Sequence, residues 1–451
     1  MFQAAPTLRR VPDPDNLAMA PDRMLVARLQ HRLGFGPRPG DYLAAVRAGF
    51  QQSRSAALKA PSVDAGTAGI GMPSIRDLGP PPASGTPDRT AYENSKRVMQ
   101  NALQLWALDR MVAADHGLTE RLTWFWQGHW ATAIGKVDTP LLMFNYYLTL
   151  NSFALGNFAD MTKAMVNDAA VIYWLDGGQN TASAPNENLA RELMELFTLG
   201  IGSYSEDDVK GAAKALTGYK VDRNSGIVTF KAKDHFSLPI SLLGKVGLLD
   251  ANSLADLLTS NPQCSYFIAE RLWYRFISST EALPMRSKIP AALAKKLSIS
   301  DGVQALAYDP GFADPKNAQV KAPVDWFVSV CRALGLMPSQ LAQQIPVLNL
   351  LRSLSQVVFD PPSVGGWPAD EAWLSTASAD LRIKTAVSLV KLGDLSPISS
   401  LPEKERVQGA ADWLGVAHWT SRTRAALLQV SKNPADLAAL AITAPEYLVS
   451  A

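Results

Sequence analysis

The sequence has little cysteine and histidine for its length and no block of like charges. Two cysteines, Cys264 and Cys331, stand far apart among 451 residues and form no CxxC pair. Neither a disulfide framework nor a cysteine zinc site is therefore indicated, and we expect two buried thiols. Lys and Arg number 43 against 41 Asp and Glu. This balance argues against nucleic acid as a partner.

The sequence also lacks a long hydrophobic run. Its most apolar stretch, 141–155, is interrupted by Asn145 and Asn151 and is too short to span a bilayer, so we expect no membrane span. Residues 1–20 carry basic and acidic side chains and no apolar centre, which is not the pattern of a signal peptide. The chain as it stands is then expected to be cytoplasmic. A chain whose signal had been removed would look the same and would be periplasmic or secreted.

Three motifs of nucleophile and phosphate chemistry are absent as well. The sequence contains no GxSxG, no GxxxxGK[ST] and no GxGxxG, so a nucleophile elbow and the known phosphate-binding loops are not indicated.

Helical periodicity is what the sequence does contain. We predict a mostly α, large multi-helix globular protein with one small β-hairpin insertion, in which 219–221 and 227–230 flank the turn Asn224, Ser225 and Gly226. A capping box of Ser205 and Asp208 starts one helix. The predicted helices are 22–33, 41–60, 90–116, 120–132, 140–151, 158–167, 171–175, 186–200, 205–217, 253–259, 265–278, 290–297, 322–334, 338–344, 424–430 and 434–442.

Three regions follow from this pattern, and we expect them to form one compact unit. Residues 1–219 make an N-terminal helical half that includes a Pro/Gly-rich loop at 61–89. Residues 220–245 are the hairpin and a connector, and 246–451 form a C-terminal helical half.

The most informative stretch is the predicted helix 186–200. On a wheel of 100° per residue its leucines and Phe197 fall on one side, and polar side chains form a stripe on the other. The stripe could be a solvated face held by ion pairs, a buried architectural contact, or a working site. Its candidate residues are Arg191, Glu192 and Glu195 for catalysis, with Glu187 and Asn188 as ligand contacts.

His129 is the best companion for this polar stripe. It follows Leu122, Phe125 and Trp126 at helical spacing, which places it on the apolar side of its helix. It is then either a core histidine with one partner or a general base or ligand.

Other residues could extend such a site. His235 could approach the stripe if the hairpin folds back over the helix, and two histidines with a carboxylate would suit Zn²⁺ or Fe²⁺. No local metal-binding spacing supports this, so we predict no metal residues. Aromatic rings such as Trp126 pack a core or provide a ligand platform. Trp367, beside Gly365 and Gly366, is expected at a pocket mouth.

Several motifs together resemble the bacterial family catalogued as domain of unknown function 1800. The resemblance covers nearly the whole chain, and its most specific block is PNENLARELMELFTLG at 185–200. The sequence departs from the family pattern at two places. Relatives tend to read NHF where Gly128, His129 and Trp130 stand here, and they tend to read HD followed by GxK around His235. The other matching blocks are RLGFGP, TWFWQGHW, SEDDVKGAAKALTGY, FIAERLWYRF, KAPVDWFVSVCRALG, PSVGGWPADEAWL and APEY.

The resemblance implies a mostly helical protein of unassigned activity, similar to ones encoded beside an exported partner family. We therefore hold two functional hypotheses. The first is an enzyme or small-ligand binder with Glu192 or Glu195 as acid/base, Arg191 as anion clamp and His129 as proton partner in a cleft between helices. The second is a non-catalytic accessory protein that assists an exported partner. The sequence does not specify a cofactor.

Overall fold

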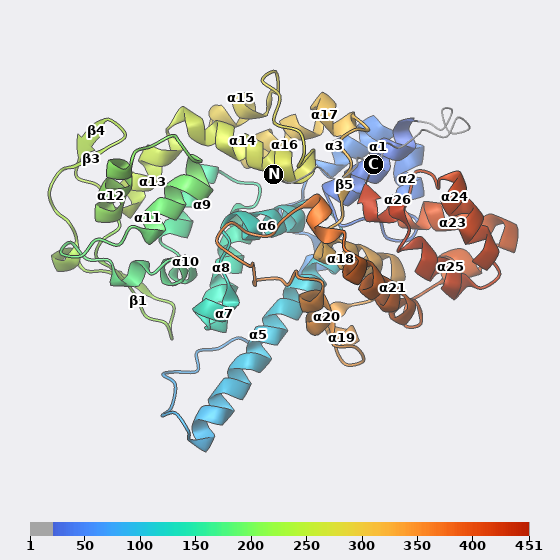
Figure 1. The fold of residues 1–451 in the computed structure, drawn as a ribbon, viewed down its shortest axis with the longest axis horizontal. Helices are drawn as coiled ribbons and strands as arrows, with labels where there is room; N and C mark the ends of the chain where they lie inside the picture. Colours follow the sequence, from blue (N-terminus) through green and yellow to red (C-terminus); the bar gives the residue numbers. More distant parts are fainter. Residues whose placement is uncertain (1–20, 451) are drawn as a thin grey trace, which may run out of the picture.

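The computed structural model describes residues 21–450 and is mostly helical (Figure 1). This confirms the predicted fold class. The expectation that residues 1–20 are not a signal peptide lies outside the described residues. None of the described helices is both long and apolar enough to cross a bilayer.

The first half of the described chain is helical up to two short hairpins. Its elements are α1 (Pro21–Arg32), α2 (Asp41–Ala48), α3 (Phe50–Ala57), α4 (Ala65–Ala68), α5 (Pro87–Ala113), α6 (Leu118–His129), α7 (Ile134–Val137), α8 (Pro140–Phe153), α9 (Phe158–Val166), α10 (Ala169–Trp174), η2 (Gly177–Gln179), α11 (Asn188–Glu192), η3 (Leu193–Thr198) and α12 (Glu206–Ala215). The hairpin region holds β1 (Tyr219–Val221), β2 (Val228–Phe230), η4 (Ala232–Asp234), β3 (Ile240–Leu242) and β4 (Lys245–Gly247).

The second half is also helical and returns to the first. Its elements are α13 (Ala251–Thr259), α14 (Pro262–Phe276), α15 (Ile289–Ala294), α16 (Ile299–Ala307), α17 (Pro310–Ala313), β5 (Gln319–Val320), α18 (Pro323–Leu334), α19 (Pro338–Leu341), α20 (Val347–Ser353), η5 (Asp370–Trp373), α21 (Thr376–Val390), α22 (Ser396–Ser399), α23 (Glu403–Leu414), α24 (Ser421–Val430), α25 (Pro434–Ala441), α26 (Pro445–Leu448) and β6 (Val449–Ser450).

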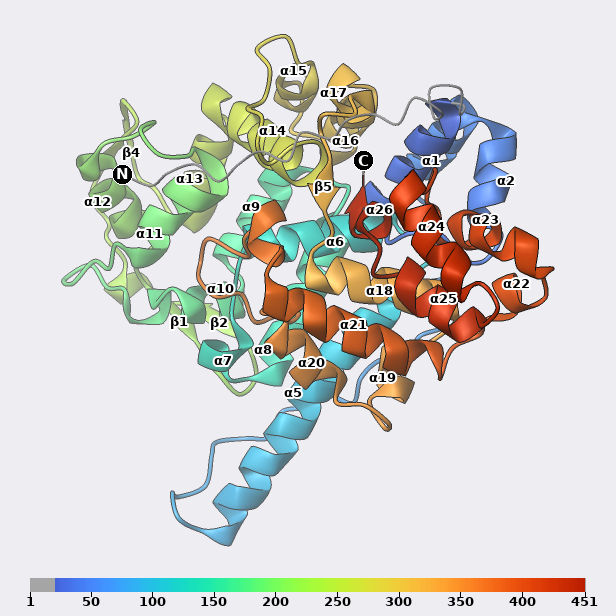
Figure 2. The ribbon, with the colours of Figure 1, turned by 45° about the vertical axis from the view of Figure 1, so that its right-hand side comes forward.

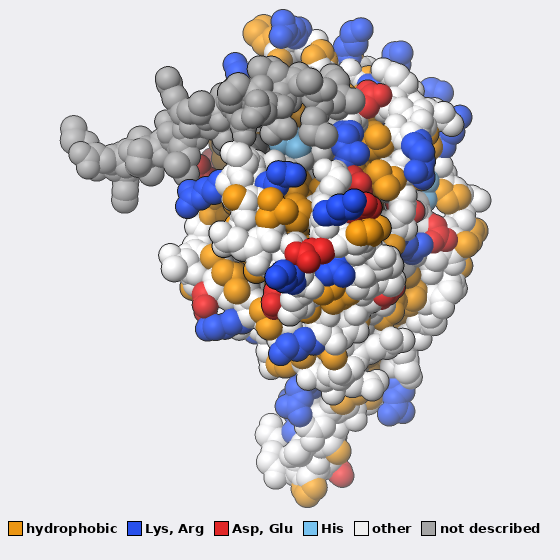
Figure 3. Space-filling model, turned by 90° about the vertical axis from the view of Figure 1, so that its right-hand side faces the viewer, with side chains coloured by type: hydrophobic (Ala, Val, Ile, Leu, Met, Phe, Trp, Pro, Cys, Tyr) orange, Lys and Arg blue, Asp and Glu red, His pale blue; other side chains and the backbone are white. Residues whose placement is uncertain are grey.

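One apolar core joins the two halves, from Val26 in α1 to Tyr447 in α26. In Figure 1, α6 lies at the centre of the molecule with α14 beside it. The N-terminal part of α5 projects away from this body (Figures 1 and 2). On the face shown in Figure 3, basic, acidic and apolar side chains are interspersed.

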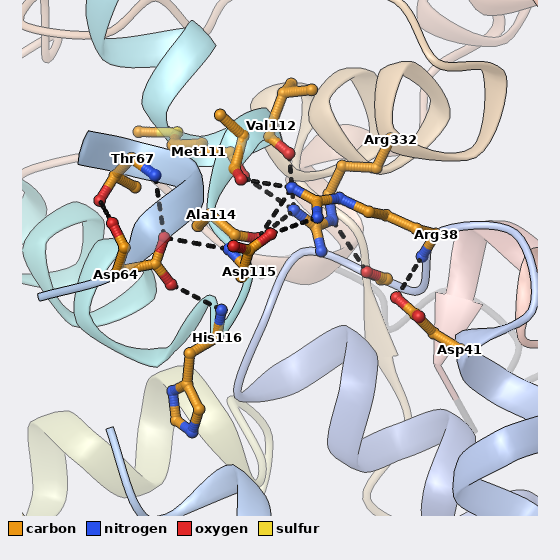
Figure 4. A network of polar contacts seen from close by, with 12 residues as sticks. Arg38, Asp41, Asp64, Thr67, Met111, Val112, Ala114, Asp115, His116 and Arg332 are labelled. Atoms are coloured by element: carbon orange, nitrogen blue, oxygen red, sulfur yellow. Dashed lines mark hydrogen bonds and ion pairs between the residues drawn. The ribbon is translucent and has the colours of Figure 1, made fainter. Parts of the chain in front are cut away.

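Two arginines satisfy the buried C-terminal end of α5 (Figure 4). Arg332 of α18 donates to the carbonyls of Val112 and Ala114 at 2.7 and 2.8 Å, and Arg38 donates to the carbonyl of Ala113. The last carbonyls of a helix have no partner within the helix. These contacts therefore connect both α18 and the segment between α1 and α2 to the same end of α5.

Several local predictions are confirmed and others are wrong. Ser205 and Asp208 form the predicted capping box, and β1 pairs with β2 as the predicted hairpin. The single helix predicted at 41–60 is two helices, because Gly49 has a φ of 83° that only glycine adopts readily. Two further strand pairs, β3 with β4 and β5 with β6, were not predicted.

Candidate functional site

The predicted helix 186–200 changes its winding halfway. It starts as α11 and continues as η3, a π-helix in which the amide of Leu199 donates to the carbonyl of Met194, five residues back, at 2.9 Å. A π-helix has a wider turn than an α-helix. A wheel of 100° per residue therefore does not describe the second half of the polar stripe.

The N-terminal part of the stripe is held in surface ion pairs. The Arg191 guanidinium contacts Glu187 at 3.0 Å and Glu206, in the first turn of α12, at 2.8 Å, with its side chain about one third exposed. Asn188 donates to the carbonyl of Leu175 at 3.2 Å. Exposed pairs of this kind contribute little to stability.

The other two carboxylates of the stripe are Glu192, the last residue of α11, and Glu195 in η3, and neither forms an ion pair among the described residues. Glu195 accepts a hydrogen bond from the Tyr204 hydroxyl at 3.2 Å. Burial and the neighbouring Glu195 charge raise the pKa of Glu192.

His129 contacts the backbone of η3 and forms no hydrogen bond with the carboxylates of Glu192 or Glu195. Its Nε2 lies 3.0 Å from the carbonyl oxygen of Phe197. Because a carbonyl can only accept, the neutral ring carries its proton on Nε2 and leaves Nδ1 as an acceptor. Nδ1 is buried and has no hydrogen-bond partner among the described residues. Burial and the Arg271 charge lower the pKa of His129 to about 3.

A cavity of about 50 Å³ opens beside this ring, and we call it the histidine cavity. The polar stripe contributes none of its walls. Trp367, expected at a pocket mouth, lines it, and the buried Trp367 Nε1 has no partner among the residues described. The walls are Trp124, Phe125, Gly128, His129, Arg271, Tyr274, Arg275, Gln356, Trp367, Pro368 and Ala369.

Arg271 of α14 is the unusual cation of the histidine cavity. Its guanidinium makes no hydrogen bond or ion pair within residues 21–450, and its one aromatic contact is with Tyr274, 6.0 Å from the ring centroid. Burial lowers its pKa. It is therefore a half-buried positive charge without a counter-ion.

A close approach of backbone to backbone shapes the cavity's rim. Gly366 has a φ of 84°, and a Cβ there would lie 2.3 Å from the carbonyl oxygen of Gly128. The two glycines let the segment 361–373 cross over α6 and place Trp367 against Gly128.

A second cavity, of about 20 Å³, lies next to the first and shares Tyr274, Arg275 and Ala369 with it. We call it the lysine cavity. At its wall the Asp325 carboxylate accepts from Arg121 at 2.6 Å and from Arg275 at 2.8 Å. Burial opposes ionisation of Asp325, but the two guanidinium groups outweigh it and lower the pKa.

Lys321 is a cavity residue whose terminal nitrogen lacks a hydrogen-bond partner among the described residues, as does Nδ1 of His31. The lysine is 7% exposed. Nζ lies 3.5 Å from the ring centroid of Tyr447. Burial, then the charges of Arg382 and Arg121, hold the pKa of Lys321 well below its usual value, and Asp325 only partly offsets them.

Cations outnumber carboxylates in the walls of the lysine cavity. A site of this composition favours an anion, because buried charges require compensation. The cations of the walls are Arg32, Arg121 and Arg275, and the carboxylates are Asp325 and Asp370.

The remaining predicted site residues lie elsewhere. Trp126 is fully buried and donates from Nε1 to the carbonyl of Ala154 at 3.0 Å. His235 lies 2.9 Å through Nδ1 from the carbonyl oxygen of Thr217. Within residues 21–450, no group of three or more His, Cys, Asp or Glu side chains is placed to hold a metal ion.

Sequence reasoning did not single out the charged residues of the two cavities. For all of them except Arg121, the signal was present in two motifs, FIAERLWYRF and KAPVDWF, where charged side chains stand among apolar ones. Such residues are rarely buried without partners, so their position on an apolar face is informative. The missed residues are Arg121, Arg271, Arg275, Lys321 and Asp325.

Comparison with known proteins adds the family and nothing about activity. No curated protein and no solved structure matches the chain. A family model described as "Protein of unknown function (DUF1800)" matches residues 28–449. Because this match covers almost the whole sequence, the chain belongs to the DUF1800 family.

Proposed function

We propose that this chain binds a small anionic ligand, carrying a phosphate or carboxylate group, in the histidine cavity and its neighbour, the lysine cavity. The observation that carries the proposal is the Arg271 guanidinium, which lines the histidine cavity with no anionic partner among the described residues. It lies close enough to His129 to lower the pKa of that ring.

The energetic argument starts from the cost of an uncompensated charge. Removing a charged group from water is expensive unless a partner of opposite sign replaces the lost hydration. Asp325 already serves Arg121 and Arg275 and is not a partner of Arg271. An anion bound beside Arg271 would supply that missing charge, with Arg275 forming the wall common to both cavities.

The polar atoms of the histidine cavity define the ligand further. Arg271 and Arg275 are donors, and guanidinium groups match carboxylate and phosphate oxygens well. Nδ1 of His129 is an acceptor, so it can also accept a hydroxyl hydrogen where the ligand carries one. Monohydrogen phosphate and a hydroxy acid both have this combination. The volumes of about 50 and 20 Å³ favour a compact ligand.

This proposal keeps the first functional hypothesis but moves its site. Arg191 and its glutamate partners lie at the surface, whereas His129 and Trp367 line the histidine cavity with Arg271. A neutral His129 serves as an acceptor for the ligand, because its proton is held on Nε2 by Phe197.

The test is a calorimetric titration with inorganic phosphate and with lactate at constant ionic strength. We expect Arg271→Met to weaken binding about tenfold or more, the usual result of removing one partner of a buried charge pair. Without ligand, this variant should melt at a higher temperature than wild type, because an unpaired cation has been removed. Exposed Arg97, which contacts Asn94 at 2.9 Å, provides the control variant Arg97→Met. Equal affinities of wild type and Arg271→Met would refute the proposal.

A further inference from the structure

The lysine cavity holds an amine that is fixed in place but makes no polar contact. The amide of Lys321 donates to the carbonyl of Leu448 at 2.8 Å, and its own carbonyl accepts from Arg382 at 3.1 Å. The backbone is thus held from both directions at the end of β5. The side chain is buried, and Nζ has no acceptor among the described residues.

Such surroundings suit a neutral amine better than an ammonium ion. A charged Nζ carries three donors and normally finds oxygen acceptors for them. Here Nζ lies over the Tyr447 ring, and a cation–π contact replaces only part of the lost hydration. Burial lowers the pKa of Lys321, and the charges of Arg382 and Arg121 lower it further, while the Asp325 carboxylate opposes them and offsets only part of the effect.

We propose that Lys321 is a nucleophile that forms an imine with the carbonyl group of a small keto acid or aldehyde acid bound across the two cavities. The inference rests on the proposed function, since the carboxylate of this ligand would be the anion held by Arg271 and Arg275. Lysines activated by desolvation or by a neighbouring cation are known to form Schiff bases with carbonyl substrates.

The chemistry balances without any further reagent. The lone pair of the neutral Nζ attacks the carbonyl carbon, a proton passes from nitrogen to oxygen, and a carbinolamine results. The C–O bond then breaks, water leaves with the second Nζ hydrogen, and a C=N bond remains. One amine and one carbonyl give one imine and one water, with no change of oxidation state.

The shared wall of the two cavities supports a ligand with both groups. Arg275 lines the histidine cavity and the lysine cavity, so an anion beside it lies next to the cavity that Lys321 lines. The lysine cavity also borders Tyr274, whose side chain is 39% exposed. This residue marks the side of the cavity that faces solvent.

The experiment traps the imine on the full chain. Protein near pH 7 is incubated with pyruvate, reduced with sodium borohydride and digested, and the modified lysine is located by mass spectrometry. We expect Lys321 to carry at least about tenfold more adduct than exposed Lys384, because few ordinary lysines are neutral at this pH. Acetaldehyde, which has the carbonyl alone, should label Lys321 less than pyruvate does, and acetate should leave no adduct.

Lys321→Arg is the matched variant. Its guanidinium is no primary amine and cannot form an imine, so the variant should lose the adduct. Labelling spread evenly over exposed lysines, or no labelling of Lys321, would overturn the inference, and the wild-type map decides this even if the variant does not fold. Labelling of Lys321 in a protein that binds no phosphate would support the nucleophile and refute only the proposed anion binding.

Discussion

Several buried arginines among the described residues donate to main-chain carbonyls. Arg32, Arg332 and Arg382 all donate to backbone oxygens of distant segments. These contacts explain the residues structurally, because a buried guanidinium can replace water with carbonyl acceptors. Arg271 and Lys321 depart from this pattern in two adjoining cavities. At the residue scale, this departure distinguishes the cations of the proposed binding site from those that hold the fold together.

The buried neutral histidine predicts how stability depends on pH. The pKa of His129 is lowered in the folded state to about 3 from an ordinary value of 6.5. Below pH 6.5 the unfolded chain therefore binds a proton that the native chain does not, so stability is complete above 6.5 and falls toward pH 3. We expect a loss on the order of 1–2 kcal/mol from this residue between pH 6.5 and 5.

Urea unfolding at pH 7.5 and pH 5 measures this loss. In His129→Gln the amide can still donate to the Phe197 carbonyl, and the difference in unfolding free energy between the two pH values should shrink. His418→Gln, at a partly exposed position, should keep the wild-type difference. The same difference in His129→Gln as in wild type would show that the ring is not the titrating group.

At this scale the sequence could predict burial better than chemistry. Apolar residues at helical spacing before His129 predicted correctly that it lies on a buried face. The role of Arg271 could not be predicted, because whether a guanidinium finds a carbonyl or an anion depends on segments far away in the chain. Trp367 was predicted to lie near a pocket because of its glycine neighbours, and it does line the histidine cavity.

At the scale of elements, the π-helix shows where helical periodicity stops being reliable. The wheel places Leu189, Leu193, Leu196 and Phe197 on one side, and all of them are buried except Leu196, which is partly buried. The π-helical hydrogen bonds of η3 are not visible in that pattern, since they depend on what the helix packs against. Thr198 donates from its hydroxyl to the carbonyl of Leu193 at 2.6 Å. The nearby carbonyl of Phe197 is the one that meets His129.

The segment 361–373 offers a matched pair of variants at the same scale. Gly366→Ala should displace Trp367 and destabilise the protein by about 1–3 kcal/mol, because a Cβ would collide with the Gly128 carbonyl and the φ of 84° is strained for alanine. Gly365→Ala should change little, since its Cβ would meet only the Ser363 hydroxyl at 3.5 Å. Melting temperatures test stability, and phosphate titration tests the cavity. Equal effects of the two substitutions would contradict this account.

On the scale of the whole molecule, the sequence predicted a helical protein but not that its C-terminal segment packs against β5 and α1. The β5–β6 pair joins 319–320 to 449–450, and each strand is too short to stand out from the helical pattern. In addition, α1 lies beside β6. Such contacts are set by the packing of the complete chain, and local periodicity carries no information about them.

The C-terminal segment therefore contributes to the proposed site as well as to the fold. Tyr447 is 1% exposed, its hydroxyl contacts Ser329, and its ring covers the Nζ of Lys321. The projecting part of the molecule is different: residues 76–85 precede α5 and are mostly exposed. Removing the C-terminal segment should therefore destabilise the protein, whereas cutting the chain within 76–85 should not.

We expect truncation after Ala444 to lower the free energy of unfolding by more than about 3 kcal/mol, the cost typical of deleting one buried aromatic side chain, because the β5–β6 pair is lost with it. Cleavage at a protease site introduced into 76–85 should leave the melting temperature within a few degrees of the intact protein, since few buried contacts are broken there. Thermal unfolding of both products tests these two predictions.

The truncated chain should also lose selective labelling of Lys321 by pyruvate, whereas the cleaved chain should keep it, because only the truncation opens the lysine cavity to solvent. A truncated protein as stable as the intact one would show that the ends of the chain do not support each other.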